Sequence, residues 1–319
     1  MKMHLAMGVL LIAGLPAALH AASPPFAFQP AEKGYYSFDT GVLRGKMRVD
    51  GTYQGIASMT YVPTGMELLK PPGVMSYYRV LTTGFRYGTH GRTGAVRDWP
   101  LVARVVDGGA LEIRFPPAAD HPMEVTGTFR WQSADTLDVE TTIKTPAALP
   151  RLELFLSNYF VEGFDALVYV KRNRYGSGKP AAFLRADWNE LLDGNYLMFP
   201  RDEDALRMIY DGRWDIPPNP VTWGFLRWLE APIAVRRHAE AGLTAAFMSP
   251  PADCFAISLP YNKQPADGVA GHRAIYLSLF GPDLAAGQTA KARCRLIVAK
   301  DLSDDVILQR YQQYLKEQP

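Results

Sequence analysis

The sequence has few residues that commonly bind metals. Its 319 residues include 2 cysteines and 6 histidines, and none of them stands at zinc-finger spacing. The sequence also has no Walker loop, no Gly-x-Gly-x-x-Gly motif and no Gly-x-Ser-x-Gly nucleophile elbow. We therefore expect no metal, no nucleotide and no other cofactor.

Neither sign of charge dominates the chain. Lys and Arg together number 34, Asp and Glu number 32, and the formal net charge is +2 at pH 7. Nucleic-acid-binding domains carry a strong basic excess, so we expect no nucleic-acid partner. A composition of 48% hydrophobic and 21% charged residues also argues against a disordered chain.

Long apolar runs do not occur after the first 22 residues. Residues 1–22 are typical of a secretory signal peptide, with Lys2 as the positive start, an uncharged apolar run at 5–19, and small residues near position 22. The run is short for a membrane-spanning helix, which needs about 20 residues. We expect a periplasmic or secreted protein with no stable membrane insertion after cleavage. The alternative is an uncleaved membrane anchor.

The two cysteines, Cys254 and Cys294, each lie in a strand-like run. In an oxidising compartment they can form a disulfide if their strands are adjacent and in suitable register. The alternative is a pair of buried free thiols, and the sequence leaves both open.

Turn-forming and aromatic residues are plentiful, with 27 Gly, 25 Pro, 6 Trp, 16 Tyr and 15 Phe. Asp107-Gly108-Gly109 separates two strand-like runs, 101–106 and 110–115, which favours a hairpin. Residues 126–131 and 136–143 predict a second hairpin with one buried face and one solvent-exposed face. Further strands are predicted at 46–49, 56–62, 167–170, 205–210, 244–248, 254–259, 274–280 and 290–298.

Helical periodicity is scarce. It predicts one short C-terminal helix at about 303–317, where Ser303 can cap and apolar residues recur at helical spacing. We find no internal repeat and no long linker, and the proline-rich segment 217–220 fits a packed surface loop. We therefore expect residues 23–319 to form a single all-β domain with antiparallel strands.

Four short motifs, in the same order, resemble those of galactose-mutarotase-like proteins. They are Thr89-His90-Gly91 with Arg97, Trp99 and Asp107-Gly108; Leu156-Ser157-Asn158-Tyr159-Phe160; Ile257-Ser258-Leu259-Pro260; and Leu284-Ala285-Ala286-Gly287-Gln288. The resemblance implies a large antiparallel β-supersandwich that binds a saccharide on a concave sheet face. That fold serves aldose epimerases and is a domain of many polysaccharide lyases and glycoside hydrolases.

The resemblance fails at the two residues on which mutarotation depends. In the family, a Glu takes the anomeric hydroxyl proton and a His protonates the ring oxygen. Leu259 stands at the position that matches the Glu, and Ser157 at the position that matches the His. We therefore expect no ordinary aldose 1-epimerase activity.

The first candidate cluster is the Gly-rich loop 86–92 and the residues that follow it. Gly lets the backbone approach a ligand closely, and Arg offers forked donors to carboxylates or vicinal hydroxyls. His90 and Asp98 are the catalytic candidates. The substrate-binding candidates are Arg86, Arg97 and Trp99. The alternative is a surface loop with local Arg97–Asp98 hydrogen bonds and with Trp99 in the core.

The second cluster is the segment 158–163. Tyr159 and Glu162 are catalytic candidates, and Asn158 is a binding candidate. Glu162 is favoured because desolvation near a sugar site can raise the pKa of a carboxyl. The alternative is that the aromatics are ordinary strand residues.

The third cluster combines Arg, Asp, Trp and Pro residues in segments 199–202 and 211–220. Its substrate-binding candidates are Arg201, Arg213 and Trp214, because loops held on a rigid sheet often carry function. The alternative is a solvated Arg213–Asp215 pair with Trp214 packed beneath the proline-rich loop.

These clusters predict an exported carbohydrate-active protein that holds a saccharide through Trp, Tyr and Arg side chains. A glycoside hydrolase needs two carboxyl groups about 5–10 Å apart. A lyase needs a Tyr or His and a group that neutralises a uronate, and the candidates satisfy these needs more easily. The alternative is a non-catalytic glycan-binding or structural envelope protein. The sugar, the oligomeric state and a structural Ca²⁺ stay open.

Overall fold

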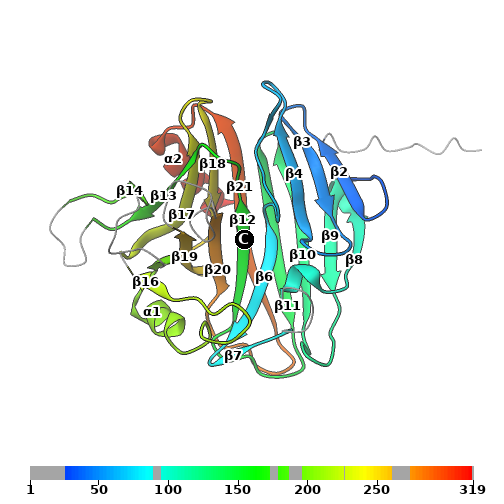
Figure 1. The fold of residues 1–319 in the computed structure, drawn as a ribbon, viewed down its shortest axis with the longest axis vertical. Coiled ribbons are helices and arrows are strands. Elements are labelled where there is room, and N and C mark those ends of the chain that lie inside the picture. The colour runs from blue at the N-terminus through cyan, green and yellow to red at the C-terminus, as the bar shows by residue number, and fades with distance from the viewer. Residues whose placement is uncertain are drawn as a thin grey trace, which may run out of the picture.

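The computed structural model describes residues 26–88, 95–172, 179–186, 196–225, 227–260 and 274–317. The leader predicted at 1–22 and the candidate His90 lie outside these residues. The described strands form three sheets, accompanied by two α-helices (Figure 1). All but one of the strand pairings in these ranges are antiparallel, so the predicted all-β antiparallel class is confirmed.

The largest sheet has nine strands. In spatial order they are β14 (Ala182–Arg185), β13 (Phe164–Val170), β17 (Leu229–His238), β18 (Leu243–Met248), β21 (Thr289–Lys300), β11 (Thr136–Lys144), β10 (Glu124–Ser133), β9 (Ala110–Phe115) and β8 (Val102–Val106).

A seven-stranded and a five-stranded sheet accompany it. The seven strands are β16 (Trp223–Phe225), β15 (Tyr196–Pro200), β19 (Cys254–Pro260), β20 (Ala274–Phe280), β12 (Glu153–Tyr159), β6 (Ser76–Thr82) and β7 (Phe85–Arg86). The five strands are β1 (Gln29–Pro30), β2 (Tyr35–Asp39), β3 (Leu43–Arg48), β4 (Gly55–Tyr61) and β5 (Met66–Glu67). The parallel pairing joins β15 and β16.

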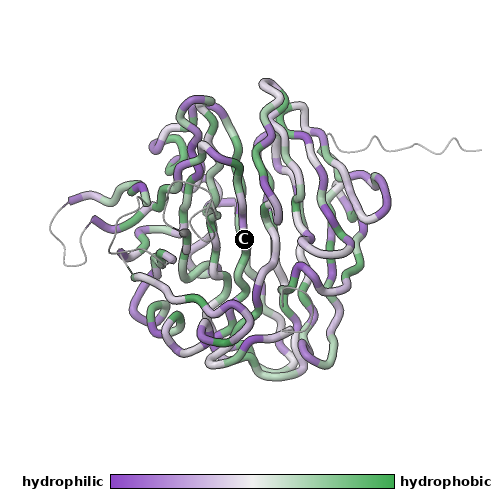
Figure 2. Tube along the Cα trace, viewed as in Figure 1, coloured by the Kyte–Doolittle hydropathy of each residue, from purple (hydrophilic) through white to green (hydrophobic). Residues whose placement is uncertain are grey.

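Both hairpins predicted from the sequence are present. Strands β8 and β9 pair across Asp107-Gly108-Gly109, where Gly108 and Gly109 have φ of 72° and 73°, a region that favours glycine. Strands β10 and β11 pair antiparallel with a register shift between Trp131 and Ser133, and buried residues largely alternate with half-buried ones along both. Hydrophilic residues gather in the peripheral loops (Figure 2).

The main hydrophobic core draws residues from all three sheets and runs in sequence from Phe28 to Val298. Strand β12 contributes to it on one face only. Leu154 and Leu156 belong to this core, whereas Phe155 and Tyr159 belong to a second apolar cluster on the other face of the strand. The seven-stranded sheet therefore has a face that points away from the main core, and that face is available for a site.

The strand predicted at 205–210 is wrong, because the segment folds as helix α1 (Glu203–Ile209). Asp202 caps the helix by accepting a hydrogen bond from the Ala205 backbone nitrogen at 2.9 Å. Two acidic residues follow in the first turn, where the helix dipole favours negative charge. Ala205, Met208 and Ile209 are buried at helical spacing.

The predicted C-terminal helix is confirmed as α2 (Asp304–Lys316), capped by Ser303. Its buried residues Ile307, Tyr311 and Tyr314 pack on β17, β18 and β21, so α2 covers part of the nine-stranded sheet (Figure 1). No helix in the described ranges is long and apolar enough to cross a membrane.

Cys254 and Cys294 are free, buried thiols. Burial raises the pKa of Cys254 to about 12 and holds that of Cys294 well above its ordinary value. Because the thiolate is the reactive form, we expect both to resist a disulfide reagent in the native protein and to react after unfolding in guanidinium. Colorimetric thiol titration checks this. A chain that shows no reactive thiol even when unfolded would contradict it.

Candidate functional site

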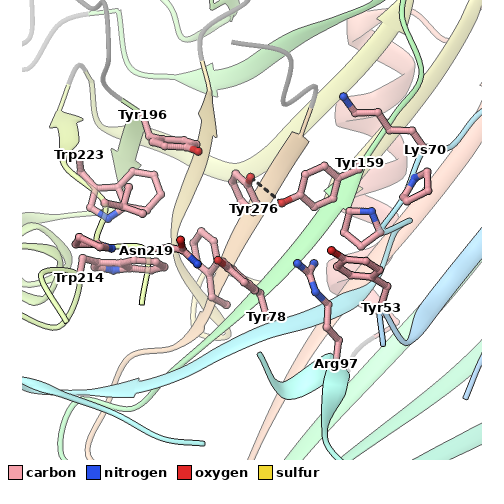
Figure 3. A pocket seen from close by; sticks show the side chains of 15 residues that line it. Tyr53, Lys70, Tyr78, Arg97, Tyr159, Tyr196, Trp214, Asn219, Trp223 and Tyr276 are labelled. Atoms are coloured by element: carbon pink, nitrogen blue, oxygen red, sulfur yellow. Dashed lines mark hydrogen bonds between the residues drawn. The ribbon is translucent and has the colours of Figure 1, made fainter. Parts of the chain in front are cut away.

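A pocket of about 660 Å³ opens on the outward face of the seven-stranded sheet (Figure 3). We call it the aromatic pocket, because eight of its fifteen lining residues are Tyr, Trp or Phe. None of these fifteen residues is acidic. They are Tyr53, Lys70, Pro71, Pro72, Tyr78, Arg97, Phe155, Tyr159, Tyr196, Trp214, Asn219, Pro220, Val221, Trp223 and Tyr276.

Strand alternation brings the central side chains of this pocket together. In β12, Phe155, Ser157 and Tyr159 share one face, since successive side chains point to opposite sides of a sheet. Ser157 pairs directly with Tyr276 of β20, which in turn pairs with Ser258 of β19. Directly paired residues lie on the same face, so these three strands form the floor of the site.

A hydrogen-bonded tyrosine pair lies at the centre of the aromatic pocket. The hydroxyls of Tyr159 and Tyr276 are 3.1 Å apart (Figure 3). Burial raises the pKa of both phenols, and the charge of Arg97 opposes this shift at Tyr159 only in part. Both hydroxyls are therefore protonated at neutral pH, which suits them to bind sugar hydroxyls.

Arg97 enters the aromatic pocket between two aromatic rings. Its guanidinium carbon is 5.1 Å from the Tyr53 ring centre and 4.7 Å from that of Tyr78, and the residue is 5% exposed. It donates a hydrogen bond to the Ser157 hydroxyl at 3.0 Å. The neighbouring Asp98 accepts from the Tyr53 backbone nitrogen at 2.9 Å, which fixes the loop that carries one of the two rings.

The proline-rich loop closes one end of the aromatic pocket, and arginines support it from below. Arg79 stacks on Trp214 at 4.8 Å and donates to the Asn219 carbonyl at 2.6 Å. Arg86 donates to the Pro218 carbonyl at 2.6 Å. Burial, together with the nearby Arg79 charge, lowers the pKa of Arg86 to about 10, so Arg86 is still protonated at neutral pH.

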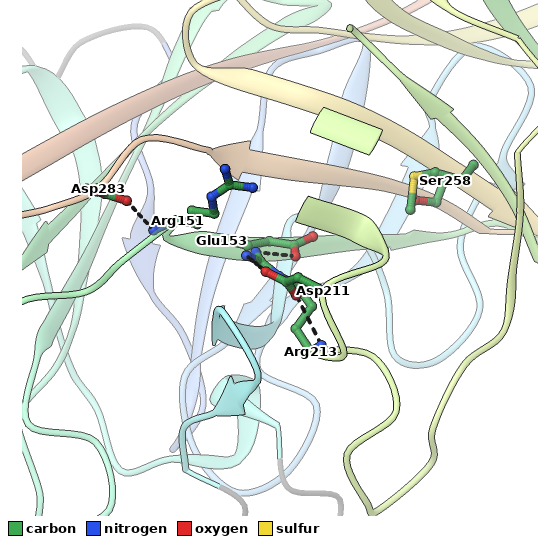
Figure 4. A network of polar contacts seen from close by, with 7 residues as sticks. Arg151, Glu153, Asp211, Arg213, Ser258 and Asp283 are labelled. Carbon is green, nitrogen blue, oxygen red and sulfur yellow. Dashed lines mark hydrogen bonds and ion pairs between the residues drawn. The ribbon is translucent and has the colours of Figure 1, made fainter. Parts of the chain in front are cut away.

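A buried ion network anchors the same loop (Figure 4). Arg213 pairs with Glu153 of β12 at 3.2 Å and with Asp211 at 2.8 Å, and the side chains of Arg213 and Glu153 are fully buried. Burial raises the pKa of Glu153, and the charge of Arg213 opposes that shift. Arg213 therefore positions the loop and does not line the aromatic pocket.

Three of the candidates predicted from the sequence, Arg97, Tyr159 and Trp214, line the aromatic pocket together. Asn158 lies on the core face of β12, where it bonds the backbones of Met75 and Ile275. Trp99 is a core residue that stacks on His121, with ring centres 3.7 Å apart.

The remaining described candidates lie outside the aromatic pocket. Glu162 is exposed in the turn after β12. Arg201 pairs with Asp202 at the start of α1 and bonds the Pro251 carbonyl.

Several pocket residues were not found by sequence reasoning. Trp223 flanks the proline-rich loop, and Tyr276 lies in a predicted strand, but a strand pattern alone does not say which face meets a ligand. Tyr53, Tyr78 and Tyr196 come from a loop and two strands that the sequence analysis did not single out.

Ser157 and Leu259, the residues that the motif resemblance aligns with the acid and the base of mutarotation, lie on different faces of the sheet. Ser157 lies beneath Arg97 on the pocket face, whereas Leu259 is fully buried in the main core. Ser258, next to it, is the residue of β19 that shares the face of Tyr276. Both Ser157 and Ser258 carry hydroxyl side chains on this face.

No family model matches the sequence, and no curated protein is significantly similar to it. Solved structures share its architecture. The Slr1438 protein of Synechocystis sp. PCC 6803 is 13% identical over 92% of this chain and 100% of that chain, with a TM-score of 0.50. The α-N-acetylgalactosaminidase NagBb of Bifidobacterium bifidum, in complex with GalNAc, is 12% identical over 88% of this chain and 38% of that chain, with a TM-score of 0.52.

The GalM/aldose epimerase homologue of C. elegans is 10% identical over 86% of this chain and 98% of that chain, with a TM-score of 0.45. At identities this low, the Slr1438 and NagBb structures show a shared fold and leave the activity to be argued from the site. The sheets, their antiparallel order and the short C-terminal helix agree with the fold predicted from the sequence motifs. The chain has the galactose-mutarotase-like β-supersandwich fold.

Proposed function

We propose that this is a carbohydrate-active protein that binds a saccharide in the aromatic pocket. The lining of the pocket carries this proposal: eight aromatic side chains surround a few polar groups in a volume of about 660 Å³. Aromatic side chains provide flat apolar faces on which sugar rings can pack. Hydroxyl groups and other hydrogen-bond donors that point into the pocket fix the orientation of the ligand, as in most small-molecule sites. The NagBb structure, which shares the fold and contains GalNAc, is in keeping with a saccharide ligand.

The described lining favours binding over hydrolysis. A glycoside hydrolase needs a pair of carboxyl groups on either side of the scissile bond. The fifteen described lining residues include none. Glu153, the nearby buried acid, is held in an ion pair with Arg213.

A lyase is the second candidate function, because Arg97 lies close enough to Tyr159 to affect its pKa. The cation offsets part of the rise in pKa that burial causes, which makes Tyr159 the candidate base of the two phenols. Formation of an unsaturated sugar, followed by ultraviolet absorbance, would distinguish a lyase from a binding protein. We also propose that residues 1–22 direct export to the periplasm or the exterior.

We expect Tyr196→Ala to weaken saccharide binding by about tenfold, which corresponds to a loss of about 1.4 kcal/mol of ring contact. Tyr196 is half-buried, lines the aromatic pocket and packs edge-on against Trp223 at 5.6 Å. Calorimetric titration of an oligosaccharide panel measures the change. Phe85→Ala is the matched control, because Phe85 is 52% exposed and lies outside the pocket lining. The proposal fails if no saccharide binds the wild type, or if both variants bind alike.

A further inference from the structure

The described lining of the aromatic pocket includes basic side chains but no acidic ones. Lys70 and Arg97 line it, whereas none of its fifteen described lining residues is acidic. Arg79 is buried behind the Tyr78 wall. The nearest described acids beneath the loop, Glu153 and Asp211, are both paired with Arg213. Arg97 therefore has no acidic neighbour among the described lining residues.

Arg79 and Arg97 lie within stacking distance of the same ring. Each guanidinium carbon is 4.7 Å from the Tyr78 ring centre, and the two residues are 1% and 5% exposed. Neither forms an ion pair with a described carboxylate. By contrast, the buried Arg213 and Arg295 each pair with carboxylates. Buried charge is costly without a counter-ion, so an anionic ligand would supply the counter-charge that these two arginines lack among the described residues.

Arg97 is the buried cation that lines the aromatic pocket. Its guanidinium end lies between Tyr53 and Tyr78 and is directed toward Tyr159 (Figure 3). One terminal nitrogen is held by Ser157, and the buried Nε atom has no hydrogen-bond partner among the described residues. The two rings fix the plane of the fork, and such a fixed fork suits a planar or tetrahedral oxyanion.

We infer that the ligand of the aromatic pocket is an acidic saccharide whose anionic group, a carboxylate or a sulfate ester, pairs with Arg97. The inference rests on the proposed saccharide-binding function and adds the charge of the ligand. The aromatic rings contact the sugar ring, and Arg97 favours a ligand whose substituent is anionic. Arg79 strengthens the positive field from behind Tyr78 while it holds the Asn219 carbonyl.

The test compares ligands that differ only in charge. Trimers of galacturonate, glucuronate and mannuronate are titrated calorimetrically into the wild-type protein beside their methyl esters, and sulfated trisaccharides beside their desulfated forms. Neutral trisaccharides complete the panel. We expect at least one acid to bind about tenfold or more tightly than its neutral form, because charge-assisted hydrogen bonds are about twice as strong as neutral ones.

The outcomes separate the two claims. A preference for the uronates assigns a carboxylate, and a preference for the sulfated sugars assigns a sulfate. Binding of neutral saccharides with no preference for any acid overturns the inference and leaves the proposed function in place. Absence of binding across the whole panel overturns the proposed function itself.

Arg97→Gln provides a second readout. The ratio of the affinity for the acid to the affinity for its ester should fall toward one in this variant. The same ratio should be unchanged in Arg104→Gln. Arg104 is an exposed residue that pairs with Glu112 far from the pocket lining. Circular dichroism verifies that each variant is folded. The wild-type comparison of acid and ester decides the inference even if Arg97→Gln does not fold.

Discussion

Arg213→Met is expected to lower the free energy of unfolding by about 3–5 kcal/mol, because it leaves a buried carboxylate without its partner. Glu153 is fully buried, and its Oε2 atom is 3.2 Å from the Arg213 guanidinium. The substitution also frees Asp211 and the loop that covers the outward face of the seven-stranded sheet. Urea unfolding followed by tryptophan fluorescence measures the loss.

The dependence of this loss on pH identifies the charge as its cause. Burial holds the pKa of Glu153 above its ordinary value, and Arg213 opposes that shift, so removing Arg213 raises the pKa further. A carboxyl with a raised pKa binds more protons in the folded chain, so it favours folding at low pH. That contribution is lost as the pH rises through the folded-state pKa. The deficit of Arg213→Met relative to wild type should therefore shrink as the pH falls and the Glu153 carboxyl becomes protonated.

A double variant serves as the control. Arg213→Met with Glu153→Leu removes both buried charges, and replacement of a buried pair by apolar groups is often close to neutral. It should recover most of the loss and remove its dependence on pH. A single variant with wild-type stability at every pH would mean that the ion network does not hold the loop.

Trp214→Ala is expected to cost about 3–5 kcal/mol of stability, the usual range for removing a large buried aromatic. Trp214 is 2% exposed and contacts three neighbours: Phe155 edge-on at 4.6 Å, Trp223 at 5.0 Å, and the Arg79 guanidinium at 4.8 Å. Its removal opens a cavity under the proline-rich loop and exposes Arg79. Saccharide binding should be lost together with the stability.

Thermal unfolding and calorimetric titration measure the two effects on the same samples. Trp214→Phe keeps part of the ring and should lose less of both. Phe85→Ala should change stability by less than about 0.5 kcal/mol, as exposed substitutions usually do. If Trp214→Ala were as stable as Phe85→Ala, the loop would not depend on the packing of the indole.

Local patterns predicted the strands well, because hairpins depend on neighbours in the sequence. Asp107-Gly108-Gly109 determines its own turn, and the alternation in β11 marks its buried face. Helix α1 was misjudged because Ala205, Met208 and Ile209 are apolar enough to suggest a strand. The signal for a helix was the cap Asp202 and the acids after it.

The site was harder to predict, because membership of a pocket depends on which face of the sheet a residue occupies. Asn158 and Tyr159 are adjacent, yet one bonds backbone in the core and the other meets Tyr276 in the aromatic pocket. Arg97 and Arg213 are similar in sequence context, but one meets aromatic rings and the other meets two carboxylates. No local pattern records a partner that lies 60 residues away, as Glu153 does from Arg213.

The aromatic pocket draws its wall from Tyr53 near one end of the described chain and from Tyr276 near the other. The pocket therefore forms only when the strands and loops that carry these residues have folded together. A ligand bound there acts on the whole folding equilibrium. At a concentration about 100 times its Kd, it would add about 2.7 kcal/mol to the free energy of unfolding of the protein. The melting temperature is therefore a direct measure of how fully the pocket is occupied.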